Sequence, residues 1–121
     1  EFLSSLDTDV LSDPVIRAQG MELEVDSLAF GMTLDRYKDQ AESGRGVGNA
    51  SAMLKYYGTE MNKRRYELLM SASGSEGVEW DGPHGSLAPE WLRTKAKSIE
   101  GGTSEVMLDI ISKRVLELPL K

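Results

Sequence analysis

The residue types that could support chemistry are most concentrated in residues 97–105, which read KSIEGGTSE. One carboxylate, Glu100, is followed by two glycines, two hydroxyl residues and a second carboxylate, Glu105. The glycines allow the backbone to approach a ligand closely, and free N–H groups at the start of a helix favour an anion. Thr103 could cap that helix or donate to a ligand, and Glu105 is equally explained by its favourable interaction with the helix dipole. The spacing alone therefore supports a binding site and an ordinary helix start equally well.

The rest of the chain offers few alternatives for catalysis or metal binding. The single histidine, His84, lies in the sequence DGPHGS, which predicts a turn and favours a solvated loop residue over a catalytic one. One histidine excludes a two-histidine metal site, and no calcium-binding loop or phosphate-binding glycine loop is present. The absence of cysteine excludes disulfides, thiolate metal ligands and thiol catalysis. We therefore predict no metal site.

The composition is that of one globular domain. The chain has 121 residues, of which 40% are hydrophobic and 28% are charged, and these values are ordinary for a folded domain. A net charge of −6 disfavours a nucleic-acid partner. No apolar run approaches the ~20 residues that a membrane span needs, and no signal peptide is recognisable. We therefore expect an intracellular domain with neither a nucleic-acid nor a membrane partner.

Two long helices are predicted in the first part of the chain, after a loop or truncated element at residues 1–12. Asp13 followed by Pro14 is a strong helix start, and the glycine-containing sequence SGRG after about residue 42 is a helix stop. Four residues with spacings of four, three and four form one apolar face of this helix: Met21, Val25, Leu28 and Met32.

The second long helix is predicted from Asn49 or Ser51 to about residue 72. Its Gly58 costs helix stability, and such a glycine usually lets another helix come close. The predicted buried stripe of this helix consists of Met53 or Leu54, Tyr57, Met61, Leu68 and Leu69.

An irregular connection and two shorter helices complete the prediction. Residues 74–89 are rich in glycine and proline, and we expect Trp80 and Trp91 to pin this connection to the bundle rather than to stack on a ligand. A short helix is predicted over residues 90–98, and a last helix starts after residue 103 and stops at Pro119. No strand pattern is present, so the predicted fold is an all-α, up-and-down helical bundle over residues 13–121.

Two blocks of the sequence resemble motifs of the acyl-CoA dehydrogenase family. Residues 98–119 (SIEGGTSEVMLDIISKRVLELP) resemble its C-terminal signature, (E/A/Y)GGTSE followed by two apolar-rich turns and (A/S)(E/K)RVLGLP. Residues 51–64 (SAMLKYYGTEMNKR) resemble its S-x-x-K-x-x-x-(S/T)-E helix. The resemblance covers residues 13–119, and because family members are much longer, it is to the C-terminal helical domain without the N-terminal helical domain and the β-domain.

The resemblance implies a flavoenzyme of fatty acid metabolism. Family members use FAD to introduce a double bond between Cα and Cβ of an acyl-CoA thioester, and an electron-transferring flavoprotein typically reoxidises the flavin. Their C-terminal domains pack into dimers and tetramers, so a homo-oligomer or a heterotetramer with a related subunit is expected. The cytoplasm is the preferred location, with the mitochondrial matrix as the alternative. Two other interpretations stay open: a non-catalytic oligomerisation module or silent subunit, and a relative that is oxidised by molecular oxygen.

The resemblance also assigns residues. Gly102, Thr103 and Glu105 match positions that bind FAD in relatives. In many relatives the catalytic glutamate directly precedes Gly-Thr, whereas here Gly101 holds that position and Glu100 lies one residue earlier. A base on a helix upstream of this chain is therefore favoured first, Glu100 second, and a silent subunit third.

Two further family positions are less well matched. The glycine-rich Q-x-F-G-G-x-G stretch of relatives has no clean counterpart in residues 71–77. Arg93 corresponds to an arginine before the signature, and an ordinary salt bridge at a helix end also explains it.

Overall fold

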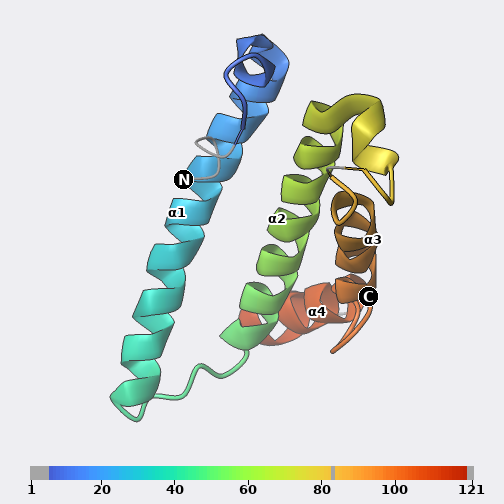
Figure 1. Cartoon of the computed structure of the whole chain (residues 1–121). Coiled ribbons are helices and arrows are strands. Elements are labelled where there is room, and N and C mark those ends of the chain that lie inside the picture. Colours follow the sequence, from blue (N-terminus) through green and yellow to red (C-terminus); the bar gives the residue numbers. More distant parts are fainter. Residues whose placement is uncertain (1–5, 83, 120–121) are drawn as a thin grey trace.

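The computed structural model describes residues 6–82 and 84–119, which form an all-helical chain (Figure 1). No strand forms within these ranges, so the predicted all-α class is confirmed. The predicted N-terminal loop is therefore described only from Leu6 onward, and Pro83 of the predicted turn lies outside the described residues. The elements in chain order are η2 (Val10–Ser12), α1 (Pro14–Glu42), α2 (Ala50–Ser73), η3 (Gly74–Val78), α3 (Leu87–Lys97), α4 (Ser104–Ile110) and η4 (Ile111–Val115).

The helices α1, α2 and α3 run up and down side by side, and α2 lies in the middle (Figure 1). The short α4 crosses the N-terminal end of α2, next to the end of α3. Because α2 contacts each of the other three helices, it is the element on which the rest of the chain is assembled. None of the helices in the described ranges combines the length and the apolar character needed to cross a membrane.

The start of α1 is the one that the sequence predicts. Asp13 is the N-cap, and its Oδ1 accepts hydrogen bonds from the backbone N–H groups of Val15 at 2.7 Å and Ile16 at 3.3 Å. Pro14 occupies the first helical position, where its missing N–H has no cost. The helix ends at Glu42, and Gly44 follows with a φ of 76°, a conformation that glycine adopts without strain.

Gly58 allows α1 and α2 to approach closely, as predicted. A Cβ atom at this position would lie 3.0 Å from Cζ of Phe30, so any larger residue would require the Phe30 ring to move. The Phe30 and Tyr57 rings lie next to this contact, with their centroids 5.9 Å apart. Tyr57 is nevertheless exposed, so its predicted place in the buried stripe is wrong, whereas Leu68 of that stripe is buried.

The apolar face predicted on α1 is not part of the core. Met21, Val25, Leu28 and Met32 keep 56–69% of their surface exposed. The face of α1 that contacts α2 contains Gly20 and Leu23 instead, and Leu23 forms the core cluster with Leu68. The two faces differ because two residues along a helix correspond to a rotation of about 200°, which places Met21 and Leu23 on opposite sides.

The second half of the chain departs from the prediction at several boundaries. The third helix, α3, begins at Leu87 and not at residue 90, because Pro89 is tolerated within the first helical turn. The last helix is shorter than predicted: α4 ends at Ile110, the π-helical turn η4 ends at Val115, and Glu117 has a positive φ of 51°. Trp91 is half-buried, as expected, but Trp80 is 64% exposed and does not pin the connection.

Candidate functional site

The two glycines between α3 and α4 create a sharp turn. Ser98 is the C-cap of α3, and Gly101 and Gly102 have φ values of 67° and 104°. These conformations are rarely adopted by residues with a Cβ atom. At Gly102 a Cβ would also collide with the Cε atom of Met107. The glycines are therefore needed for the turn itself, and the turn sets the direction in which α4 starts.

Thr103 and Glu105 stabilise the start of α4. Thr103 is the N-cap, and its Oγ1 accepts a hydrogen bond of 3.2 Å from the backbone N–H of Val106. The backbone N–H of Glu105 itself, and secondly the Thr103 hydroxyl, hold the pKa of the Glu105 carboxyl below its ordinary value. The capping role considered for Thr103 is thus confirmed, and Glu105 is an ionised, solvent-exposed acceptor next to it.

A cavity of about 360 Å³ lies beside this turn. Its lining comes from α2, from the turn and from α4, so α2 meets a segment that lies about forty residues later in the sequence. The lining residues are Tyr56, Glu60, Lys63, Ser98, Ile99, Thr103, Ser104, Glu105 and Leu108. The structure therefore brings two of the predicted site residues, Thr103 and Glu105, into one concave surface.

Glu60 is a functional candidate that the sequence analysis did not single out. Its Oε1 accepts from Lys63 Nζ at 2.8 Å and from Ser104 Oγ at 3.1 Å, so it links α2 to the first residue of α4. The Lys63 ammonium is the main reason why the pKa of the Glu60 carboxyl lies below its usual range, although partial burial opposes this. The signal was present in the sequence, because Glu60 is the last residue of the S-x-x-K-x-x-x-(S/T)-E block.

Glu100 has a different environment from Thr103 and Glu105. It does not line the cavity, and its carboxylate pairs with Arg93 of α3, with Nη2 at 3.2 Å from Oε2. The Glu100 side chain is 49% exposed, and the Arg93 side chain is 58% exposed. The salt bridge considered for Arg93 is therefore present, and its partner is the candidate base itself.

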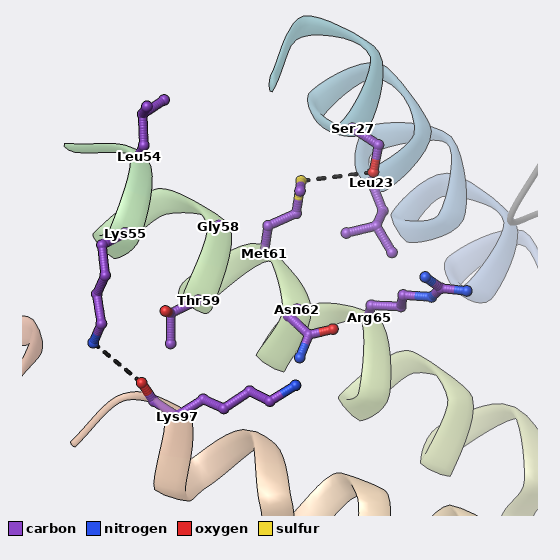
Figure 2. Close-up of a pocket in the computed structure, with 10 residues that line it drawn as sticks. All are labelled: Leu23, Ser27, Leu54, Lys55, Gly58, Thr59, Met61, Asn62, Arg65 and Lys97. Atoms are coloured by element: carbon purple, nitrogen blue, oxygen red, sulfur yellow. Dashed lines mark hydrogen bonds between the residues drawn. The ribbon is translucent and has the colours of Figure 1, made fainter. Parts of the chain in front are cut away.

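Lys55 joins α2 to both ends of the turn. Its Nζ donates to the carbonyl oxygen of Gly102 at 2.6 Å and to that of Lys97 at 3.1 Å. The bond to Lys97 is visible in Figure 2, which shows a second cavity of about 430 Å³ between α1, α2 and the end of α3. Like Glu60, Lys55 belongs to the motif block on α2, at its lysine position.

The remaining candidates lie elsewhere. His84 lies exposed in the connection between η3 and α3, and its Nε2 is 3.8 Å from Oε2 of Glu76 in η3. Across residues 6–82 and 84–119, no group of three or more His, Cys, Asp or Glu side chains is arranged to hold a metal ion.

The comparison with protein families gives one match that spans most of the chain. The family described as acyl-CoA dehydrogenase, C-terminal domain, matches residues 5–116. Neither the curated proteins nor the solved structures gave a match. The matched range includes all four helices, the Gly-Gly turn and the cavity next to it. The chain therefore belongs to the acyl-CoA dehydrogenase family, as its C-terminal domain.

Proposed function

We propose that this chain forms one wall of the FAD site of an acyl-CoA dehydrogenase. The observation that carries the proposal is the cavity at the Gly-Gly turn, where Thr103 and Glu105 lie beside Glu60 and Ser104. Gly102 contributes through its conformation, because it makes the turn possible. The substrate would be an acyl-CoA, and an electron-transferring flavoprotein would reoxidise the flavin, as the family implies. The compartment stays a prediction from the sequence, with the cytoplasm preferred.

The side chains of the cavity fit one part of FAD better than another. Two carboxylates, those of Glu60 and Glu105, face a single ammonium, that of Lys63. Carboxylates accept hydrogen bonds from hydroxyl groups and repel a pyrophosphate. Ser104 and Thr103 add two hydroxyls that both donate and accept. We therefore assign this wall to the hydroxyl-bearing ribityl or ribose portion of the cofactor.

The residues of the chain support binding more directly than proton transfer. The bound flavin would accept the hydride from Cβ, a step that no side chain can perform. A carboxylate that removes the Cα proton works best when it is partly desolvated. Glu100 is half-exposed and paired with Arg93, so it would have to lose both water and this partner to act as the base. We therefore keep an upstream base as the first proposal, Glu100 as the second and a silent subunit as the third.

A titration of the 121-residue chain with FAD, followed by flavin fluorescence, tests the proposal. Replacement of Thr103 by Ala together with Glu105 by Gln is expected to weaken FAD binding at least about tenfold, because a hydroxyl and the negative charge of an acceptor are lost. The matched control replaces Thr33 by Ala and Glu22 by Gln on α1, outside the cavity. Equal affinity in the two double variants would contradict the assignment.

A second function, subunit assembly, is favoured by the exposed apolar face of α1. Met21, Val25, Leu28 and Met32 recur at the alternating spacing of a two-helix seam, and all four are mostly exposed. We propose that this face pairs with a second copy of the chain. A native mass determination is expected to show a dimer or tetramer that Val25→Glu dissociates. A monomeric wild-type chain would contradict this function without affecting the FAD proposal.

A further inference from the structure

We propose that Lys55 is a positioning residue that holds the Gly-Gly turn in the conformation that presents Thr103 and Glu105. The consequence for the cofactor rests on the proposed FAD site, whereas the effect on the turn stands on its own. No side-chain atom of Lys55 lines the cavity beside the turn. Its action is therefore indirect, through the backbone.

The geometry ties both ends of the turn to α2. Lys97 is the last residue of α3, and Gly102 directly precedes the N-cap of α4. The ammonium of Lys55 binds the carbonyl oxygens of both residues, at 3.1 and 2.6 Å. An ammonium has three donors in a compact group, so one side chain can bind two carbonyls that approach from different directions. Figure 2 shows the Lys55 side chain extending from α2 to the backbone at the end of α3.

The turn needs such an anchor because its own sequence is permissive. Two consecutive glycines have more accessible backbone conformations than any other pair of residues. Holding them in one conformation therefore has a large entropic cost. A backbone bond from the Ser104 N–H to Ser98 O, at 3.1 Å, also closes the turn. Lys55 adds a charge-assisted contact from a helix that is fixed by the buried Ala52 one turn earlier. Lys55 thus restrains the segment between α3 and α4 by binding it to α2.

The contact also affects the peptide group that leads into Thr103. Gly102 O belongs to the same peptide group as the backbone N–H of Thr103. A hydrogen bond from a cation to that oxygen polarises the peptide and makes its N–H a stronger donor. Within residues 6–82 and 84–119, Lys55 forms hydrogen bonds to carbonyl oxygens and no ion pair, so a carboxylate does not neutralise its charge there. Lys55 therefore both orients this peptide and makes its N–H a stronger donor.

The test compares Lys55→Met with Lys97→Met in the 121-residue chain. Lys55→Met keeps the aliphatic length but removes the charge and the donors. Lys97→Met removes a nearby charge that lines the same second cavity but leaves the Lys97 carbonyl in place. Amide hydrogen exchange measured by NMR reports on the turn without any flavin, and an FAD titration reports on the consequence for binding.

We expect Lys55→Met to raise the exchange rate of the Ser104 amide at least about tenfold. This factor corresponds to the loss of one hydrogen bond that involves a charged group. The same variant should weaken FAD binding at least about fivefold. Lys97→Met should change both quantities less than about twofold. If Lys55→Met lowers the overall helical signal, Lys55→Arg becomes the deciding variant. It keeps the charge with a different donor geometry, and it should raise Ser104 exchange while amides of α1 keep their protection.

The outcomes separate this inference from the function on which it partly rests. Unchanged Ser104 exchange in Lys55→Met, or equal effects of the two methionine variants, would overturn the positioning role. If the wild-type chain binds no FAD while Lys55→Met still accelerates Ser104 exchange, the FAD proposal fails and the positioning role stands. If the turn loosens but FAD affinity is unchanged, Lys55 holds the turn for a purpose other than the cofactor, and the inference about the site is overturned.

Discussion

The two sides of α2 differ in how completely they are covered. On one side, α3, the Gly-Gly turn and α4 are tied to α2 by Lys55, by Glu60 and by the ion pair between Lys95 and Glu67. On the other side, α1 contacts α2 along one face and leaves a second apolar face exposed. The first region has side chains that are already fixed by local contacts. The second has apolar surface that the described residues leave exposed.

This difference corresponds to the two functions that we propose for one small domain. A binding site needs groups held in place before the ligand arrives, and Thr103 and Glu105 have that support. An assembly surface needs exposed apolar area, and the α1 face consisting of Met21, Val25, Leu28 and Met32 provides it. The molecule therefore combines a preorganised turn with an unpaired helix face.

The largest expected effect comes from truncating the small core. Leu68 is buried and packs with Leu23, so Leu68→Ala is expected to lower the free energy of unfolding by about 2–5 kcal/mol. Leu28→Ala removes the same atoms from the exposed face of α1 and is expected to change it by less than about 0.5 kcal/mol in dilute solution. Urea unfolding followed by circular dichroism measures both.

The matched pair also sharpens the comparison between the two sides. If α1 pairs with a second copy, the effect of Leu28→Ala should grow with protein concentration, because association stabilises the folded chain by mass action. The effect of Leu68→Ala should not depend on concentration in this way. Equal losses of stability in the two variants at low concentration would mean that the Leu28 face of α1 is also buried in the isolated chain, contrary to the structure.

The second effect concerns the turn. Gly102→Ala forces a residue with a Cβ atom into a φ of 104° and against the flexible end of Met107, so about 1–3 kcal/mol of stability should be lost. Gly46→Ala is the matched control, because the φ of Gly46 is not positive and no atom lies within 4 Å of a Cβ placed there. Thermal unfolding of the two variants measures the difference, and similar melting temperatures would argue against the strained turn.

Local signals predicted the elements, and long-range contacts decided which faces are buried. Asp13-Pro14 and the glycine that follows α1 located that helix from its ends, and Thr103 did the same for the start of α4. Periodicity could not locate the core, because both Met21 and Leu23 are apolar positions of α1. Contacts with α2, such as that of Phe30 with Gly58, select the face that contains Leu23. The periodicity of one helix does not predict which of its apolar faces packs against another helix.

The residues of the candidate site were predicted only in part for the same reason, and their role stays a prediction. Thr103 and Glu105 are close together in the sequence, so one motif revealed both. Glu60 and Lys55 reach the turn from α2, more than forty positions earlier along the chain. Their motif block was recognisable in the sequence, but their hydrogen-bond partners were not. Residue types do not indicate which backbone carbonyl or which residue at a helix start a side chain will bind.

The smallest expected effect is the pH dependence of the link between α2 and α4. The Lys63 ammonium, and to a lesser extent the Ser104 hydroxyl, lower the pKa of the Glu60 carboxyl from its ordinary value of 4.5. Between its folded and its unfolded pKa, such a carboxyl binds fewer protons in the folded state than in the unfolded state. Its contribution to stability is therefore lost as the pH falls from the unfolded pKa through the folded pKa. The contribution should therefore be complete above about pH 5 and disappear below the lowered pKa.

The measurement compares the wild-type chain with Glu60→Gln. The difference between their free energies of unfolding should become smaller over the same pH interval. Glu22→Gln on α1 is the control. A difference that stays constant from pH 7 to pH 3 would show that Glu60 holds α4 by the shape of its side chain rather than by its charge.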